Sequence, residues 1–277
     1  MKYKIFAIDL DGTLLNWKKS INSLNFKALK SYCDAGGMPV IITGRAPDSA
    51  KKYITQIEKK INHKIKYLGS LNGNIVEDLS LNEIIYSKSV PSFLCEKLYH
   101  IAMKYNLVFW PYTVEGIEKE YVEIYGPKSF SMIVQHFHKG TKIVRPRVYR
   151  AHQSYKINII NNGSKSYKLF KAYKYIVNNL QDELDIAFTS KWVFEITMKN
   201  SNKGKAIKII ADRENINLEN VAAIGDSAND IPMFKVVGHP IGSRSSHHAI
   251  TEYVDYIVKD GAEECVAKAI MEDLLHE

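Results

Sequence analysis

The stretch that decides the fold is residues 3–15, which read YKIFAIDLDGTLL. A nearly continuous apolar run ends at Asp9, and Asp11 and Gly12 follow directly. Apolar residues at consecutive positions predict a strand that is buried on both faces. We therefore expect residues 3–9 to form a buried strand whose carboxyl end carries two carboxylates.

The segments after this strand alternate between helical and strand patterns. The alternation predicts an α/β fold with a parallel sheet and right-handed crossovers. Before residue 85 the expected elements are a helix at 22–35, a strand at 38–43, a helix at 47–61 and a strand at 65–71. Near the C-terminus they are a helix at 203–215, a strand at 220–225, a helix at 229–236, strands near 238–241 and 254–258, and a helix at 262–275.

The middle of the chain has a different pattern, which predicts an α+β insert. Its expected elements are a helix at 91–105, an antiparallel hairpin of strands at 106–112 and 118–125, a helix near 128–138, a strand at 155–160, a helix at 165–180 and strands near 184–189 and 192–197. We therefore expect a discontinuous core formed by residues 1–84 and 192–277, with an inserted domain formed by residues 85–191.

The composition is that of a folded soluble protein. Of the 277 residues, 45% are hydrophobic and 25% are charged. The three cysteines are far apart in the sequence, which argues against a disulfide framework or a zinc ribbon. No stretch approaches the roughly 18–20 apolar residues that span a bilayer, and the N-terminal run is too short for a signal peptide. We expect a cytoplasmic protein that does not bind membranes.

The net charge of +8 favours anionic partners. The excess is uneven, since residues 86–190 contain 15 Lys and Arg against 8 Asp and Glu. No acidic residue lies between Glu123 and Asp182. This basic stretch either steers an anionic substrate or is a solvated surface without such a role.

Two short motifs after the first one have side chains that suit phosphate. Thr43-Gly44-Arg45 follows the second strand and offers a hydroxyl, a glycine backbone and a guanidinium. Lys203-Gly204 begins a helix, where the macrodipole disfavours a lysine unless an anion lies nearby. Taken alone, each motif is read more simply as a turn or a solvated lysine.

A fourth motif, Gly225-Asp226-Ser227-Ala228-Asn229-Asp230, follows another apolar strand. Ser227 or Asp226 can cap the next helix, which is the simpler interpretation. However, two more acids near Asp9 and Asp11 would be costly to bury without a cation. The pattern therefore favours a divalent metal ion at these strand ends.

In this order, the four motifs resemble those of the haloacid dehalogenase-like superfamily of phosphotransferases. The insert after the third strand resembles that of the Cof-type subgroup, and the resemblance runs from Lys4 to about Leu275. It implies a Rossmann-like parallel-sheet core with an inserted α+β cap that selects the substrate. It also implies a Mg2+-dependent phosphatase acting on a small phosphorylated metabolite, such as a sugar phosphate or a nucleotide or cofactor phosphate.

The resemblance assigns roles to individual residues. Asp9 would be the nucleophile that forms an aspartyl-phosphate, and Asp11 would protonate the leaving alkoxide and then activate water. Thr43 and Lys203 would hold the phosphoryl oxygens. Mg2+ would be bound by the Asp9 carboxylate, the Asp11 carbonyl and Asp226, with Asp230 and Asn229 supporting the metal or the lysine. The implied metal set is Asp9, Asp11, Asp226 and Asp230, and the implied substrate-binding set is Gly44, Arg45, Asn72, Gly73 and Asn229.

Two loops and the insert leave alternatives open. Asn72-Gly73 either lines the mouth of the site or simply forms a hairpin turn. Residues 241–245 read IGSRS, where the subgroup commonly has a Met-Gly-Asn-Ala stretch. In the insert, the candidates for substrate selection are Trp110, Tyr121, Tyr125, Tyr149, His136 and His138, although packing is the simpler role for the aromatic ones.

Three alternatives to a phosphatase follow from the same residues. A phosphomutase would return the phosphoryl group to the substrate. A nucleic-acid-binding protein would use the basic insert, but no recognised binding motif is present, so we expect no nucleic-acid partner. A catalytically silent regulator is disfavoured by the intact set of Asp9, Asp11, Lys203 and Asp226. The oligomeric state is left as monomer or homodimer.

Overall fold

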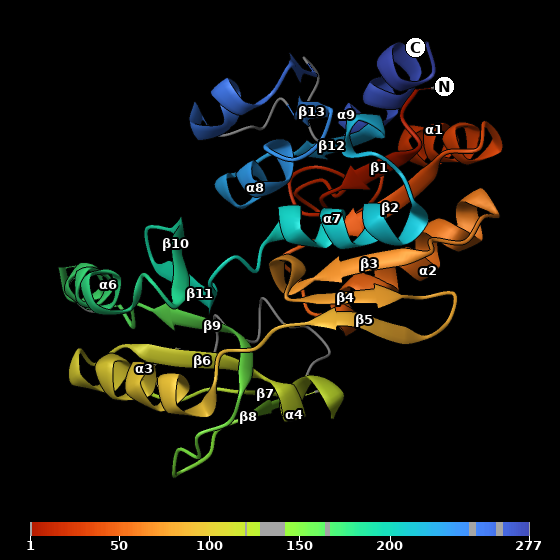
Figure 1. Cartoon of the computed structure of the whole chain (residues 1–277). Helices are drawn as coiled ribbons and strands as arrows, with labels where there is room; N and C mark the ends of the chain where they lie inside the picture. Colours follow the sequence, from red (N-terminus) through yellow and green to blue (C-terminus); the bar gives the residue numbers. More distant parts are fainter. Residues whose placement is uncertain are drawn as a thin grey trace. The chain divides into compact units, whose positions relative to one another are not determined.

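The computed structural model describes residues 2–119, 121–127, 142–163, 167–243, 248–258 and 263–276. The chain divides into two compact units. The first unit combines Met1–Tyr86 with Asn202–Glu277, and the second is Ser87–Ser201. In Figure 1 the first unit runs from red to orange and from cyan to blue, and the second from yellow to green.

The boundaries of the units differ from the predicted ones. The first follows Tyr86, close to the expected position after residue 84. The second follows Ser201, so the structure places residues 192–201 in the second unit instead of the core. The reason is strand pairing, because β11 (Val193–Met198) is antiparallel to both β10 (Leu184–Ser190) and β9 (Ser154–Ile160).

The first unit is built on an eight-stranded sheet with the order β14-β13-β12-β1-β2-β3-β4-β5. Neighbouring strands from β14 to β3 are parallel, and β3 and β4 are antiparallel. The predicted α/β core with a largely parallel sheet is therefore confirmed. Its strands are β1 (Ile5–Ile8), β2 (Met38–Ile42), β3 (Tyr67–Ser70), β4 (Ile75–Asp78), β5 (Glu83–Ser87), β12 (Val221–Gly225), β13 (His239–Gly242) and β14 (Tyr256–Ile257).

Helices cover both faces of this sheet, which explains why β1 is apolar at every position. Phe6 and Ile8 lie in one hydrophobic cluster, and Ile5 and Ala7 lie in another. The first cluster includes residues of α1 (Ser23–Asp34), α2 (Pro47–Ile61), α9 (Cys265–Lys268) and the π-helical turn Ala269–Leu274, and the second includes residues of α7 (Lys203–Glu214) and α8 (Ile231–Phe234). Short 3-10 turns lie at Leu71–Gly73, Leu218–Asn220, Ala228–Asp230 and His248–Tyr253.

The second unit contains a four-stranded sheet with the order β10-β11-β9-β6, where β6 is Val108–Thr113. Phe109, Ile157 and Phe194 of this sheet share one hydrophobic cluster with residues of α3 (Ser92–Lys104) and α6 (Tyr167–Leu180). A separate parallel pair consists of β7 (Tyr121–Glu123) and β8 (Lys142–Val144). The predicted α+β character of this region is confirmed.

The antiparallel hairpin expected at 106–112 and 118–125 is confirmed only at one bridge, where Phe109 and Tyr125 exchange backbone hydrogen bonds of 3.0 and 2.9 Å. A short helix, α4 (Val114–Glu118), separates β6 from β7, and β7 pairs with β8 instead. The helix starts there because the Thr113 hydroxyl accepts a hydrogen bond from the Gly116 amide at 2.9 Å. The helix expected near 128–138, with His136 and His138, lies outside the described residues.

No helix in the described part of the chain combines the length and the hydrophobicity needed to cross a bilayer.

Candidate active site

The predicted site residues come together at the carboxyl ends of neighbouring parallel strands. Asp9 follows β1, Thr43 follows β2 and Asp226 follows β12. Strand β1 lies between β2 and β12, so the chain crosses to opposite sides of β1 at this point. Such a switch in strand order is where ligands bind in open α/β sheets.

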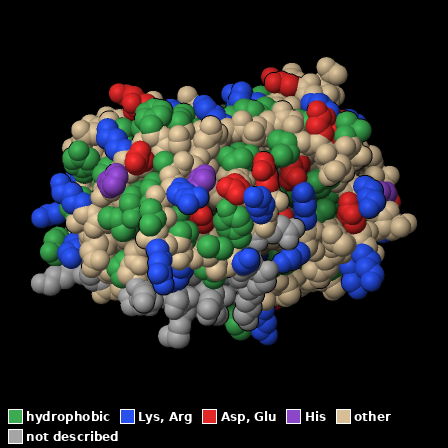
Figure 2. All heavy atoms as spheres, turned by 90° about the horizontal axis from the view of Figure 1, so that it is seen from below, with side chains coloured by type: hydrophobic (Ala, Val, Ile, Leu, Met, Phe, Trp, Pro, Cys, Tyr) green, Lys and Arg blue, Asp and Glu red, His purple; other side chains and the backbone are tan. Residues whose placement is uncertain are grey.

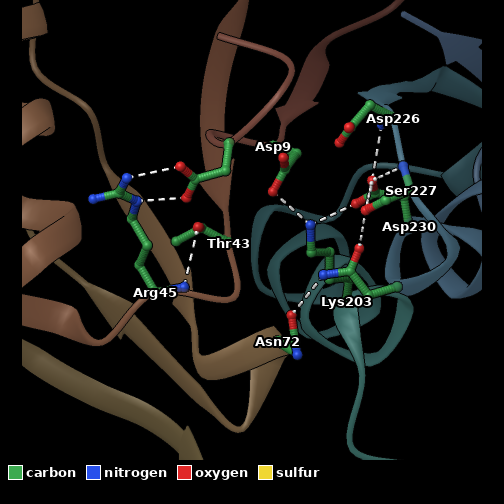
Figure 3. Close-up of polar contacts among 10 residues, drawn as sticks. Asp9, Thr43, Arg45, Asn72, Lys203, Asp226, Ser227 and Asp230 are labelled. Atoms are coloured by element: carbon green, nitrogen blue, oxygen red, sulfur yellow. Dashed lines mark hydrogen bonds and ion pairs between the residues drawn. The ribbon is translucent and has the colours of Figure 1, made fainter. Parts of the chain in front are cut away.

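Lys203 supplies the central cation of the site. It is fully buried, and its Nζ lies 2.6 Å from Asp9 Oδ1 and 2.5 Å from Asp230 Oδ1 (Figure 3). Burial lowers the pKa of Lys203, but the two carboxylates outweigh burial and raise that pKa above its ordinary value. The two acids therefore favour the ammonium form of this side chain and remove its conflict with the helix dipole.

The start of α7 is shaped to place this lysine. The Asn202 side chain caps the helix by accepting a hydrogen bond from the Lys205 amide at 3.1 Å. A Cβ atom at Gly204 would lie 2.1 Å from the Pro232 carbonyl oxygen. Glycine at this position therefore permits the close approach of α7 to α8.

Asp230 has protein partners on both oxygens. Oδ1 pairs with Lys203, and Oδ2 accepts hydrogen bonds from the amides of Asp226 at 2.9 Å and Ser227 at 3.0 Å. A Cβ atom at Gly225 would lie 2.4 Å from Asp230 Cγ, so the glycine makes room for this carboxyl group. Asp230 thus ties the loop after β12 to Lys203.

Asp226 is in a different environment. Its Oδ1 is buried and has no hydrogen-bond partner among the described residues. Burial and the neighbouring Asp230 raise the pKa of Asp226 to about 7. A Cβ atom at Gly12, which has φ +86°, would lie 2.3 Å from Asp226 Oδ2, so this carboxylate sits against the glycine of the first motif.

Together, the three buried acids form a group suited to a cation. One oxygen from each of Asp9, Asp226 and Asp230 lies within 4.8 Å of the others. Burial, Asp230 and Asp226 raise the pKa of Asp9 well above its ordinary value, against the opposing effect of Lys203. Three carboxylates face one ammonium, so a hard divalent cation with oxygen ligands fits the remaining negative charge.

Arg45 forms two hydrogen bonds with Asp11, and the sequence did not predict this contact. Arg45 Nε is 2.6 Å from Asp11 Oδ2, and Nη2 is 2.7 Å from Asp11 Oδ1. Nη1 donates to the Ser49 hydroxyl at 3.0 Å, and the guanidinium stacks 4.8 Å from the centre of the Tyr53 ring. The guanidinium that we expected to contact substrate is therefore bound within the protein.

Lys19 is a site residue that sequence reasoning missed. Its Nζ lies 2.6 Å from Asp11 Oδ1. Burial raises the pKa of Asp11, but the hydrogen bonds and charges of Arg45 and Lys19 outweigh burial and lower that pKa below its ordinary value. No spacing rule singles out Lys19, because the contact depends on the conformation of the loop that carries it.

Thr43, Gly44, Asn72 and Asn229 also meet at this edge of the sheet. The buried Thr43 hydroxyl accepts a hydrogen bond from the Arg45 amide at 3.2 Å, and Asn229 Nδ2 donates to Asn72 Oδ1 at 3.1 Å. A Cβ atom at Gly44 would lie 2.9 Å from Asn72 Oδ1. Figure 3 shows Asn72 and Thr43 near Lys203 and Asp9.

Asn72-Gly73 also forms the turn between the antiparallel strands β3 and β4, which confirms the hairpin interpretation. Gly73 has φ +86°, and a Cβ atom there would lie 2.5 Å from the Asn202 carbonyl oxygen. The turn therefore packs against the start of α7. The proximity of Asn72 to Asn229 shows that the same turn borders the site.

Other predicted positions have different surroundings. In the loop at 241–245, Ser243 is buried and its hydroxyl donates to the Gly12 carbonyl oxygen at 3.3 Å, while residues 244 and 245 lie outside the described residues. Trp110 stacks on Tyr112, and Tyr125 packs against Tyr149. Within the second unit, these aromatic contacts support a packing role for Trp110, Tyr125 and Tyr149.

The basic stretch of the insert is described only in part. Lys142, Arg145 and Arg147 are exposed. Figure 2 shows one face of the molecule, on which Lys and Arg side chains lie among acidic and hydrophobic ones. Whether this charge steers substrate stays a prediction.

The fold is of the α/β class, and its site gathers three acids around a buried lysine. The model of the haloacid dehalogenase-like hydrolase family matches residues 6–270. The chain therefore belongs to this family, as its motifs indicated, and it is a phosphatase.

Similar proteins support the same assignment. Two are 5-amino-6-(5-phospho-D-ribitylamino)uracil phosphatases from Bacillus subtilis (strain 168). YcsE is 26% identical over 96% of this chain and 94% of its own length, and YwtE is 28% identical over 95% and 96%. A haloacid dehalogenase-like hydrolase from Bacteroides thetaiotaomicron has the same fold, with a TM-score of 0.81, 22% identity and coverage of 98% of this chain and 99% of that chain.

Proposed function

We propose that this phosphatase hydrolyses a small phosphorylated metabolite through an aspartyl-phosphate on Asp9 and that it requires Mg2+. The observation that carries the proposal is the buried Lys203 ammonium between Asp9 and Asp230, together with the Asp226 oxygen that none of the described residues hydrogen-bonds. A cation fixed next to a carboxylate lets that carboxylate approach a phosphate dianion, which it would otherwise repel.

The donor set fits Mg2+. Asp9 and Asp226 would hold the ion through carboxylate oxygens, and the family resemblance adds the Asp11 carbonyl. When bound, Mg2+ would neutralise negative charge on the phosphoryl oxygens and orient the ester. We assign Asp230 a supporting role, because Lys203 and two backbone amides already engage its oxygens.

In the first step, an Asp9 oxygen attacks phosphorus and the bond from phosphorus to the ester oxygen breaks. The leaving oxygen takes a proton from Asp11, and an acyl phosphate remains on Asp9. In the second step, water attacks phosphorus and gives a proton to Asp11. Asp9 returns to a carboxylate and inorganic phosphate leaves. Lys203 and the Thr43 hydroxyl bind phosphoryl oxygens in both steps.

The pairing of Asp11 with Arg45 bears on the first step. A carboxyl group held by two cations is ionised, which suits the proton acceptor of the second step. To act as the donor in the first step, Asp11 must lose its pairing with Arg45. A bound phosphate is a competing anion for Arg45, so we retain Arg45, with Gly44, Asn72, Gly73 and Asn229, as the substrate-binding set.

The substrate class is a phosphorylated polyol, sugar, nucleotide or cofactor. The two Bacillus subtilis relatives act on a uracil that carries a phosphoribityl chain, so this compound belongs in the first set of esters to be tested. We assign the choice among these esters to the inserted unit. We also propose that the protein acts in the cytoplasm, as a monomer or homodimer, without a nucleic-acid partner.

The test is hydrolysis of p-nitrophenyl phosphate and of a panel of phosphate esters, with and without Mg2+. Wild type should show metal-dependent turnover, and Asp9→Asn should show none. Asp34→Asn is the matched control, because Asp34 is an exposed acid on α1 that pairs with Lys30. Turnover that is independent of metal, or that survives in Asp9→Asn, would refute the mechanism.

A further inference from the structure

The loop Asn16–Ser20, directly after the first motif, is held in one conformation by its own hydrogen bonds. Asn16 Oδ1 accepts hydrogen bonds at 3.0 Å from the Lys18 amide, the Ser20 amide and the Ser20 hydroxyl. The Lys19 amide donates to the Asn16 carbonyl oxygen at 2.9 Å, and the Asn16 amide donates to the Ser20 carbonyl oxygen at 3.1 Å. The loop is therefore a closed turn and not a loose connection.

Lys19 has an unusual backbone conformation within this turn. Its φ is +59°, in the left-handed region where a residue with a Cβ atom is disfavoured. Glycine or asparagine would be accommodated there more easily. The turn holds a lysine in this conformation, and the lysine side chain reaches Asp11. Strain of this kind at a site edge points to a functional side chain.

The Asp11 carboxylate accepts contacts from two different loops. Arg45, from the loop after β2, engages both oxygens of Asp11, and Lys19 shares Oδ1 at 2.6 Å. Asp226, from a neighbouring loop, is a further charged group close to Asp11, since the Asp11 charge contributes to the raised pKa of Asp226. With donors from two separate loops, the carboxyl group has less freedom to rotate than it would with Arg45 alone.

We propose that Lys19 is a positioning residue that holds the Asp11 carboxyl group in the orientation from which it protonates the leaving group. The inference rests on the proposed function, in which Asp11 protonates the ester oxygen. Loss of a correctly placed proton donor slows only those esters whose leaving group needs protonation. An alkyl phosphate needs it, and p-nitrophenyl phosphate, with its stable phenolate, does not.

The experiment compares kcat/KM for glycerol 2-phosphate and for p-nitrophenyl phosphate in the presence of Mg2+. This constant reports the steps up to departure of the leaving group. Lys19→Gly keeps the left-handed backbone and removes the ammonium, so its thermal midpoint should equal or exceed that of wild type. We expect a fall of ~10- to 100-fold on the alkyl ester and less than ~3-fold on the aryl ester.

Two further variants complete the design. Lys19→Arg should restore most of the activity on the alkyl ester, because a cation again reaches Asp11. Lys18→Ala is the matched control, since the Lys18 ammonium lies over the Trp17 ring. Its two kcat/KM values should equal those of wild type.

The outcomes separate the inference from the function on which it rests. Equal falls on both esters in Lys19→Gly, or no change on either, would overturn the role of Lys19. Failure of wild type to turn over either ester with Mg2+ would overturn the proposed function and, with it, the role of Asp11.

Discussion

The Lys203 ammonium lies 2.6 Å from the Asp9 carboxylate, and both side chains are buried. A buried ion pair of this kind contributes little net stability, because desolvation offsets its attraction. Removal of one partner is costly, however, since the other charge stays buried without compensation. The pair therefore links the folding of the core to the chemistry of the site.

Lys203→Met should test both consequences. The variant leaves Asp9 and Asp230 without their shared cation, so we expect a loss of about 3–5 kcal/mol in the free energy of unfolding. Activity should fall by at least ~100-fold, because the phosphoryl oxygens lose a donor. Urea unfolding and ester hydrolysis measure the two effects. Lys205→Met, on an exposed lysine of the same helix, should change neither.

Asp226→Asn should separate metal binding from stability. Wild type should gain about 2.7 kcal/mol of stability at a Mg2+ concentration 100 times its dissociation constant. The variant should lose most of that gain, because the proposed ligand is the buried Asp226 oxygen, which has no hydrogen-bond partner within the described ranges. Without metal, the variant should be at least as stable as wild type, since one buried like charge is removed.

Thermal midpoints measured across a Mg2+ titration check this prediction. Asp212→Asn, an exposed acid on α7, is the control and should titrate like wild type. An undiminished Mg2+ response in Asp226→Asn would exclude Asp226 as a ligand.

Glu214 should make the stability of the first unit depend on pH. Its Oε1 accepts hydrogen bonds from the Tyr67 hydroxyl at 2.5 Å and from Lys66 Nζ at 2.6 Å. Burial raises the pKa of Glu214, but these two donors outweigh burial and lower that pKa below its ordinary value. A lowered folded-state pKa means that the stabilisation is present above the unfolded-state pKa and is lost as pH falls through the folded-state pKa.

Glu214→Gln should therefore be less stable than wild type by about 1 kcal/mol near neutral pH. The difference should shrink as pH falls below about 4.3, the ordinary pKa of Glu, and vanish below the folded-state pKa. Urea unfolding at a series of pH values measures it, with Glu219→Gln as an exposed control. A difference that is constant with pH would contradict the assignment.

Charge reversal of the basic stretch should test steering. We expect that replacement of Lys142, Arg145 and Arg147 by Glu lowers kcat/KM for a dianionic ester and reduces its dependence on ionic strength. The physical reason is that long-range attraction raises the encounter rate with an anion. If kcat/KM and its salt dependence stay at wild-type values, the basic stretch has no steering role.

The secondary structure of the core could be read from the sequence because its signal is local. Strands buried on both faces are apolar at every position, and Pro47 at the start of α2 marks the predicted helix. Strand pairing in the insert could not be read in this way. Val122 pairs with Ile143, which lies 21 positions further along the chain. No local sequence pattern near 118–125 predicts that pairing.

The identity of the site residues was likewise predictable from the sequence, whereas their contacts were not. The sequence placed Asp9, Thr43 and Asp226 at strand ends, and the parallel sheet brings those ends together. Arg45 was expected to meet substrate, but it pairs with Asp11. A sequence motif identifies which side chains are available at the site. The distances between them in the folded chain decide which anion a guanidinium binds.

The sequence by itself determined the family, the buried strands and the acids that follow them, because burial on both faces and the spacing of motifs are properties of neighbouring residues. Only the tertiary structure decided that one ammonium pairs with both Asp9 and Asp230, while an oxygen of Asp226 has no hydrogen-bond partner in the described part of the chain. Lys203 and Asp9 are 194 residues apart in the chain. Their contact exists because α7 packs beside the carboxyl ends of the strands, and the energy of a buried charge depends on distances that no linear pattern contains.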